Sequence, residues 1–236
     1  ATGTHLFVVS AHATYPRGYF RFLAEACDRL GAACTGGILK TTTKGETPIA
    51  RCIQAVLGDP FGVGNATFRT GTAVARQVDT VAFGCYPRWA FDRFGTYDER
   101  LIRNQDIELN KRIRAGGGAI WLLPDTQATY FARSTLTSFL KNQFENGRWN
   151  LLTVALTGSI RAVSLRHLVP AVFVIALLPA LLSPLWILSG SLPLVVLAAY
   201  LPLALWRAFR LRGLGAPVFL TWAVFPVLHL AYGAGS

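Results

Sequence analysis

One short segment of the sequence places a carboxylate where it could act as a base. The segment RNQDIELNKRIRAGGG, residues 103–118, has the composition of a helix that begins after Asn104 and ends at its glycines. Asp106 would then occupy the second helical position, where the partial positive charge of the helix N-terminus favours an ionised carboxylate. Such a group could accept a proton during a reaction, or it could only complement the helix dipole. The segment alone leaves both interpretations open.

The remaining charges of this segment have simpler interpretations. Glu108 is followed by Lys111 and Arg112 three and four residues later, which predicts an ion pair on the helix surface. At the end of the helix, Gly116 or Gly117 can adopt the left-handed conformation that closes many helices.

A second group of candidates comes from the ends of predicted strands. The apolar run THLFVVSAH, residues 4–12, ends in Ser10 and His12, and a later run ends near Gly84. A histidine at the end of a strand can hold a metal or a phosphate, or it can be purely structural. Because a doubly wound sheet binds ligands at the carboxyl ends of its strands, we expect these residues and Asp106 to converge on one cleft.

A third candidate region is the segment NQFENGRW, residues 142–149. Gln143 fits an amphipathic helix, and Arg148 and Trp149 follow one turn later. An arginine offers a bidentate fork for phosphate. The same Arg-Trp pair could instead anchor a helix at a membrane interface, and the two roles are compatible.

The elements that must position these residues alternate along the first 150 residues. Apolar periodicity and turn residues predict strands at residues 4–12, 33–39, 77–88 and 119–132, helices at 17–32, 47–58, 88–95 and 105–115, and a glycine-rich loop at 61–71. This alternation is typical of an α/β domain with a largely parallel sheet. About 150 residues are enough to bury one core.

Composition restricts the classes of function. All 12 acidic residues lie within residues 1–150, while residues 151–236 carry five arginines and no Asp, Glu or Lys. A net charge of +11 could indicate nucleic-acid binding, but this distribution favours membrane orientation, so we expect no nucleic-acid partner. The four cysteines form no C-x-x-C pair, which predicts reduced, buried thiols and no structural zinc.

The last third of the chain has the composition of a membrane module. A helix that spans a bilayer needs about 20 apolar residues, and the sequence predicts three spans, at residues 168–188, 192–206 and 216–234, with a turn at 189–191 between the first two. A buried hairpin in a soluble protein is the alternative. Arginines precede the first span and fill residues 207–215, so both these segments and the soluble domain are expected to face the cytoplasm.

In their order, these segments resemble the membrane-bound glycosyltransferases of family 2, which have the GT-A fold. The resemblance is to the succinoglycan-biosynthesis glucosyltransferase type and covers residues 5–150. It rests on SAHATYP (10–16), FGVGN…FRTG (61–71), VDTVAFG (78–84), GTYDERLIRNQDIELNKRIRAGG (95–117) and the element Gln143…Asn146-Gly147-Arg148-Trp149.

The resemblance implies an inverting transfer of a hexose from a nucleotide-sugar, expected to be a UDP-sugar, to a lipid-linked saccharide acceptor. The setting would be exopolysaccharide or cell-envelope glycan synthesis at the bacterial inner membrane. Asp106 falls at the position of the general base, and His12 at the position that holds Mg²⁺ or Mn²⁺. Ser10 and His12 would contact the donor. The residues expected to contact the acceptor or the diphosphate are Gly84, Gln105, Gln143, Arg148 and Trp149.

The sequence departs from this pattern at three places. Ser10 stands where the group has an aspartate, so a hydroxyl that can bind a ribose replaces a charged metal ligand. Gln105 replaces the glutamate beside the base. The chain begins at Ala1 without methionine and lacks the first βαβαβ portion of the group, so we expect a further segment upstream.

Two other functions remain to be weighed against this one. The first is a relative that has lost catalysis and serves as a membrane-anchored scaffold or partner, which the change at Ser10 would suit. The second, a transporter or channel subunit, has little support, because the tail has no intramembrane acid and only His229 is ionisable within a predicted span. The sequence predicts a fold of two parts: a partial GT-A domain at residues 1–150 and a membrane domain at residues 151–236.

Overall fold

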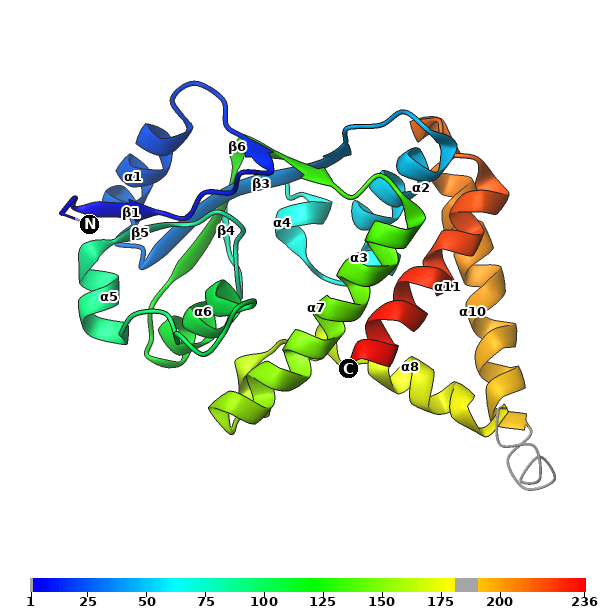
Figure 1. The fold of residues 1–236 in the computed structure, drawn as a ribbon. Helices are drawn as coiled ribbons and strands as arrows, with labels where there is room; N and C mark the ends of the chain where they lie inside the picture. The colour runs from blue at the N-terminus through cyan, green and yellow to red at the C-terminus, as the bar shows by residue number, and fades with distance from the viewer. Residues whose placement is uncertain (1, 181–190) are drawn as a thin grey trace. The chain divides into compact units, whose positions relative to one another are not determined.

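The computed structural model describes residues 2–180 and 191–236 (Figure 1). The chain divides into two compact units. One, here called the sheet unit, consists of Ala1–Thr42, Asn65–Phe131 and Leu152–Ser164. The other, the helical unit, consists of Thr43–Gly64, Ala132–Leu151 and Leu165–Ser236. The division of function predicted at residue 150 stays a prediction.

A six-stranded sheet forms the centre of the sheet unit. Its strands are β1 (His5–Phe7), β2 (Ala13–Thr14), β3 (Cys34–Thr43), β4 (Arg76–Gln77), β5 (Cys85–Pro87) and β6 (Ile120–Ala132). The order is β1-β5-β3-β6-β2, and β4 also pairs with β6. The mixed α/β class predicted from the sequence is therefore confirmed.

The direction of the strands corrects the sequence-based prediction. The pairs β1–β5, β3–β5, β2–β6 and β4–β6 are all antiparallel, so the largely parallel sheet expected from the alternation of strands and helices is wrong for these pairs. An apolar run predicts a strand covered on both faces, and it carries no information about the direction of its neighbour. The predicted strand at residues 77–88 also divides into the short strands β4 and β5.

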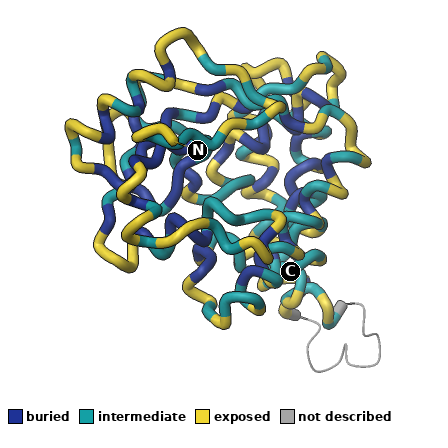
Figure 2. The backbone as a smooth tube through the Cα atoms, turned by 60° about the vertical axis from the view of Figure 1, so that its left-hand side comes forward, coloured by how far each residue is buried: buried dark blue, intermediate teal, exposed yellow. Residues whose placement is uncertain are grey.

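Helices cover both faces of this sheet. Leu122 and Leu123 are consecutive in β6, so their side chains point to opposite faces. Leu122 packs in a cluster with Leu109 and Ile113 from α6 (Gln105–Ala115), together with Ala90 from α5 (Arg88–Phe94). Leu123 packs with Tyr19, Leu23, Ala26 and Cys27 from α1 (Tyr19–Leu30). The buried residues of these layers are dark blue in Figure 2.

The helical unit is built around α11 (Val218–Gly235), whose largest contacts are with α2 (Pro48–Leu57), α8 (Val169–Leu177) and α10 (Ser191–Arg210). The unit also contains α3 (Pro60–Val63), the first part of α7 (Leu136–Thr157), and the 3-10 turns η2 (Leu165–His167), η3 (Leu178–Ala180) and η5 (Arg212–Leu214). The predicted loop at 61–71 contains α3 and, in the sheet unit, α4 (Thr67–Thr70). A further 3-10 turn of the sheet unit is η1 (Ile160–Ala162).

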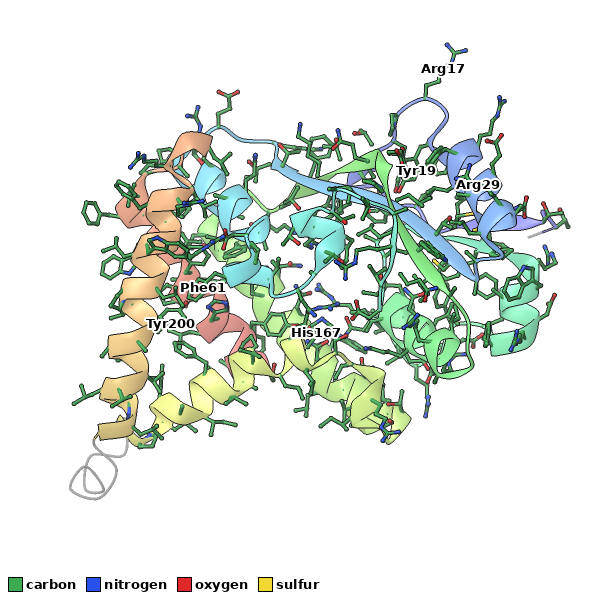
Figure 3. All side chains as sticks on the ribbon, turned by 180° about the vertical axis from the view of Figure 1, so that it is seen from behind. Arg17, Tyr19, Arg29, Phe61, His167 and Tyr200 are labelled. Carbon is green, nitrogen blue, oxygen red and sulfur yellow. The ribbon has the colours of Figure 1, made fainter. Side chains whose placement is uncertain are left out.

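Aromatic rings fill the centre of the helical unit. The ring of Tyr200 on α10 lies 5.2 Å from that of Phe61 on α3 and 4.6 Å from that of Phe173 on α8, measured between ring centroids. Tyr200 also hydrogen-bonds to Nδ1 of His229 on α11 at 2.6 Å. Figure 3 labels Phe61 and Tyr200, whose side chains meet from the two helices.

Two helices of the described chain are long and apolar enough to cross a membrane, namely Leu192–Arg210 and Val218–Gly235. They match the second and third predicted spans. The first predicted span, 168–188, begins as α8, but residues 181–188 and the predicted turn residues 189 and 190 lie outside the described residues. Three spans are therefore not confirmed.

Candidate functional site

The candidate base Asp106 lies in the first turn of α6, as the sequence predicted. Asn104 precedes the helix in the left-handed conformation, with φ of 65°. Its side chain does not cap the helix; instead its Nδ2 donates to Oγ1 of Thr153 at 3.4 Å. Asn tolerates the left-handed conformation better than most residues. The conformation still costs energy, and such strained residues are concentrated at functional sites.

Asp106 is half-buried, and its carboxylate is partly desolvated. Its Oδ1 accepts a hydrogen bond from the backbone N–H of Ile107 at 2.9 Å. Burial raises the pKa of Asp106, although backbone hydrogen bonds oppose the shift. The pKa values of Cys34, Tyr86 and Tyr97 are raised mainly by burial, and the charge of Asp106 adds to each shift. Asp106 therefore lies close enough to these three side chains for its charge to act on them.

Gly84 borders the same group of side chains. A Cβ atom at Gly84 would lie 2.6 Å from Sγ of Cys34 and 3.0 Å from Cε2 of Tyr86, so no larger residue fits. The preceding residue, Phe83, has φ of 53°, which is strained for an aromatic residue. Strained backbone thus precedes both Gly84 and Asp106, and the structure brings these two predicted residues around Cys34 and Tyr86.

A buried polar network holds the helix that carries Asp106. Asn110 lies one turn after Asp106 and is fully buried. Its Oδ1 accepts from the Tyr86 hydroxyl at 3.0 Å, and its Nδ2 donates to Oγ1 of Thr80 at 2.8 Å. The sequence motifs did not point to Asn110. The available signal was an asparagine inside a helix, where its propensity is poor unless its side chain has partners.

Glu108 and Arg112 form a second support, which corrects the predicted surface pair. Glu108 is only 7% exposed, and Arg112 contacts both of its carboxylate oxygens, at 2.6 and 2.7 Å. The same guanidinium donates to the carbonyls of Phe94 and Thr96. The pair therefore fixes the loop that leads into Tyr97. The prediction failed because helical spacing shows that two charges can meet, but does not show what covers them.

Ser10 and His12 form a tight turn after β1. Oγ of Ser10 accepts from the backbone N–H of His12 at 3.1 Å, and the carbonyl of Ser10 accepts from the N–H of Ala13 at 3.2 Å. The N–H of Ser10 donates to the hydroxyl of Tyr15 at 2.9 Å. The Ser10 hydroxyl thus helps to fold this turn, and the imidazole of His12 is exposed.

Backbone hydrogen bonds place this turn beside other predicted residues of the sheet unit. The N–H of Val8 donates to the carbonyl of Gly84 at 3.1 Å, and the N–H of Phe131 donates to the carbonyl of His12 at 2.8 Å. The turn of Ser10 and His12 is therefore connected to the segments of Gly84 and Phe131, and Asp106 belongs to the same unit. Gln105 is half-buried at the first position of α6.

The turn around His12 offers few of the ligands that a divalent cation requires. Mg²⁺ and Mn²⁺ prefer carboxylate and other oxygen ligands. Within residues 2–180 and 191–236, no three His, Cys, Asp or Glu side chains are grouped so that they could hold a metal ion. One imidazole and a hydroxyl that already accepts a hydrogen bond do not form a metal site of this kind.

The other three predicted residues lie on the part of α7 that belongs to the helical unit. Gln143 is buried, Trp149 is half-buried, and Arg148 is exposed with its Nη1 at 3.5 Å from Oε1 of Glu145. The contact between Arg148 and Glu145 is an exposed pair three residues apart, which contributes little to stability.

Gly147, in the same motif, has a packing role that the sequence did not reveal. A Cβ atom there would lie 1.9 Å from the carbonyl oxygen of Tyr232 on α11, so only glycine lets the two helices approach this closely. One turn away, the side chain of Asn150 donates to the Tyr232 hydroxyl. The motif therefore fixes α7 against α11.

We expect Gly147→Ala to lower the thermal unfolding midpoint of the detergent-solubilised protein by roughly 3–10 °C, because a backbone clash forces the helices apart. Gly213→Ala is the matched control, since a Cβ atom at Gly213 meets nothing within 4 Å. Equal midpoints for the two variants would show that α7 and α11 do not pack as described.

The similarity to known proteins agrees with the resemblance that the sequence motifs indicate. No protein-family model matches the chain. Over 148 residues the chain is 28% identical to the succinoglycan biosynthesis protein ExoA of Rhizobium meliloti (strain 1021). The match covers 63% of this chain and 44% of the relative, so the chain spans less than half of that protein's length. The predicted resemblance is thus confirmed at a coarse level, as distant similarity to a protein of succinoglycan biosynthesis.

Proposed function

We propose that this protein is an inverting glycosyltransferase of exopolysaccharide or cell-envelope glycan synthesis. It would transfer a hexose from a nucleotide-sugar, expected to be a UDP-sugar, to a lipid-linked saccharide at the cytoplasmic face of the bacterial inner membrane. The similarity to a succinoglycan biosynthesis protein supports this class of reaction. The observation that carries it is the partly desolvated carboxylate of Asp106. It lies in the first turn of α6, two residues after the strained backbone of Asn104, and the ion pair of Glu108 and Arg112 holds this helix in place.

The proposed step is a direct displacement at the anomeric carbon. The acceptor hydroxyl oxygen forms a bond to that carbon while the bond to the diphosphate oxygen breaks, which inverts the configuration. The proton of the hydroxyl passes to Asp106, whose raised pKa makes it a stronger base than an exposed aspartate. The braces from Asn110 and Arg112 limit the motion of α6, so the carboxylate keeps its position during the transfer.

The other predicted residues have supporting roles in this proposal. Ser10 and His12 would contact the donor, Gly84 and Gln105 would line the position of the diphosphate or acceptor, and Gln143, Arg148 and Trp149 would contact the acceptor or diphosphate. The Mg²⁺ or Mn²⁺ that the resemblance implies at His12 is not part of this mechanism. Because the side chains at that turn lack the carboxylates this ion prefers, no step of the mechanism is assigned to it.

Association with a membrane is supported by the composition and surface of the C-terminal helices. Of the apolar window in α10, only 17% is buried, which differs from the core helix of a soluble protein. The exposed apolar side chains of α8, α10 and α11 include Val172, Ile175, Leu194, Val195, Phe209 and Phe219. A lipid-linked acceptor would then lie in the same bilayer as the helices.

The test is sugar transfer in membranes from cells that express the natural gene. Membranes would be incubated with radiolabelled UDP-glucose, UDP-galactose and other nucleotide-hexoses, and label would be measured in the lipid extract. We expect label from one donor. The same measurement with His12→Ala, with added Mn²⁺ or with a chelator, shows whether a metal ion changes the rate of transfer through this residue. If folded protein transfers no label from any donor, the scaffold function becomes the better proposal.

A further inference from the structure

Arg69 is a desolvated cation that the proposed mechanism has not used. It lies on α4, within the FRTG segment of the glycine-rich loop. Its side chain is half-buried, and burial lowers the pKa of its guanidinium. Desolvating an arginine without a counter-charge is costly, so such a residue needs a partner that carries negative charge.

The described part of the sheet unit does not supply that negative charge. Nη1 of Arg69 donates to Oγ1 of Thr41 on β3 at 2.9 Å, and no carboxylate of the described residues forms an ion pair with it. A guanidinium has five N–H donors. The nitrogens of Arg69 are absent from the buried unpartnered atoms of residues 2–180 and 191–236, so the donors that Thr41 does not use are not sealed inside the protein.

The guanidinium is held in a fixed orientation. It stacks 5.5 Å above the ring centroid of Tyr130 on β6 and 5.6 Å from that of Phe68. Stacking on the aromatic rings and the hydrogen bond to Thr41 fix the plane of the guanidinium. The N–H groups on its other edge can then donate to an anion. The segment that carries it ends at Gly71, whose φ of 89° is accessible to glycine at little cost.

The position of Arg69 relates it to the candidate donor residues. Tyr130, beneath the guanidinium, is the cross-strand partner of Ala13, the residue that follows His12. The N–H of the next residue, Phe131, donates to the carbonyl of His12. Thus Arg69, Tyr130 and the turn of Ser10 and His12 are joined by direct contacts within one unit.

We propose that Arg69 binds a phosphate oxyanion, and that in the working protein this is the diphosphate group that leaves the sugar. The anion site stands on the geometry around Arg69, while its identification with the leaving diphosphate rests on the proposed function. A guanidinium at this position supplies positive charge where Ser10 and His12 supply no carboxylate to hold a metal ion. Bidentate hydrogen bonds from arginine would stabilise the negative charge that develops on the departing group.

The test measures binding of inorganic diphosphate, UDP and uridine to the whole protein in lipid nanodiscs, by calorimetry. We expect Arg69→Gln to raise the Kd for diphosphate and UDP by roughly ten- to a hundredfold, and to leave the Kd for uridine unchanged. Arg69→Lys keeps the charge but loses the planar fork, so its Kd for diphosphate and UDP should lie between the values of the unmodified protein and of Arg69→Gln. Arg29→Gln, at an exposed position of α1 labelled in Figure 3, is the control that removes the same charge.

Further arms separate the possible sources of the phosphate and the possible failures. Nanodiscs with and without a polyprenyl diphosphate show whether the lipid competes with UDP; displacement of UDP by the lipid through Arg69 would assign the site to the acceptor instead. Unchanged diphosphate binding in Arg69→Gln, with sugar transfer intact in the natural protein, would refute the anion site and leave the transferase proposal standing. Diphosphate binding that depends on Arg69, in a protein that transfers no sugar, would support the anion site and contradict the transferase proposal.

If Arg69→Gln does not fold, the guanidinium can be observed directly in the unmodified protein. With ¹⁵N-arginine, the Nε–Hε signal of Arg69, assigned by its absence in Arg69→Lys, should shift during titration with inorganic diphosphate. A signal that does not move at saturating diphosphate would refute the proposal.

Discussion

Asp106→Asn should lower the rate of sugar transfer by about two to four orders of magnitude, the contribution typical of a general base. The amide is the same size as the carboxylate and its oxygen can still accept from the N–H of Ile107, so the fold is kept and only the proton acceptor is lost. Donor binding should remain nearly unchanged. The measurement is label in the lipid extract under single-donor conditions, together with UDP binding to the same preparation.

The matched control for this variant is Asp92→Asn, an exposed aspartate on α5 in the same unit. It removes the same charge away from the buried network and should transfer sugar at the unmodified rate. If Asp106→Asn also retains its rate, Asp106 is not the base, and its carboxylate only complements the dipole of α6.

The same variant should show opposite effects on activity and on stability. Burial raises the pKa of Asp106 above its ordinary value of 3.8, so the folded state binds this proton more tightly than the unfolded state does. The stabilisation from the protonated carboxyl is complete below pH 3.8 and is lost as the pH rises through the raised pKa. At pH 7 the ionised group is therefore a cost, and Asp106→Asn should unfold at a higher temperature than the natural protein.

This difference has a pH signature that a simple packing effect would lack. The gain in unfolding temperature of Asp106→Asn should shrink as the pH is lowered towards 4, where the natural carboxyl becomes protonated in both states. Over the same range, the transfer rate of the natural protein should fall, because a protonated carboxyl cannot accept the proton from the acceptor. A constant gain at all pH values would contradict the assignment of burial as the cause.

Arg207→Gln should destabilise the helical unit by about 3–5 kcal/mol, which corresponds to roughly 6–20 °C in the unfolding midpoint. Asp59 is only 2% exposed, and its Oδ1 accepts from Nε of Arg207 at 3.1 Å. The same Asp59 oxygen caps α3 through the N–H of Phe61 at 2.9 Å. Removing the guanidinium leaves a buried carboxylate without its counter-charge, which is the costly way to break such a pair.

Arg210→Gln is the control, because Arg210 is also in the last turn of α10 and is exposed. It should change the free energy of unfolding by less than about 1 kcal/mol, as surface substitutions usually do. The double variant Asp59→Asn with Arg207→Gln should recover part of the loss, since neither partner is then a buried unpaired charge. Equal midpoints for the two single arginine variants would mean that the pair contributes no net stability.

The sequence alone determined the features that depend on neighbouring residues. Helices α1, α2 and α6 lie where periodicity, Pro48 and the residues around Asn104 predicted them. After the end of α6, Gly117 adopts the left-handed conformation. The apolar composition likewise predicted α10 and α11. These signals are local, because helix formation is governed by residues three to four positions apart.

Only the tertiary structure decided the features that depend on residues distant in the sequence. The antiparallel pairing of β5, the burial of Glu108, and the contacts of Asn110 with Tyr86 and Thr80 require knowing which segments meet. The stacking of Arg69 on Tyr130 joins residues 61 positions apart in the chain, and Gly147 matters because α11 passes close to it. Burial, strand direction and close packing are properties of the pairing of segments, and a single sequence does not state that pairing.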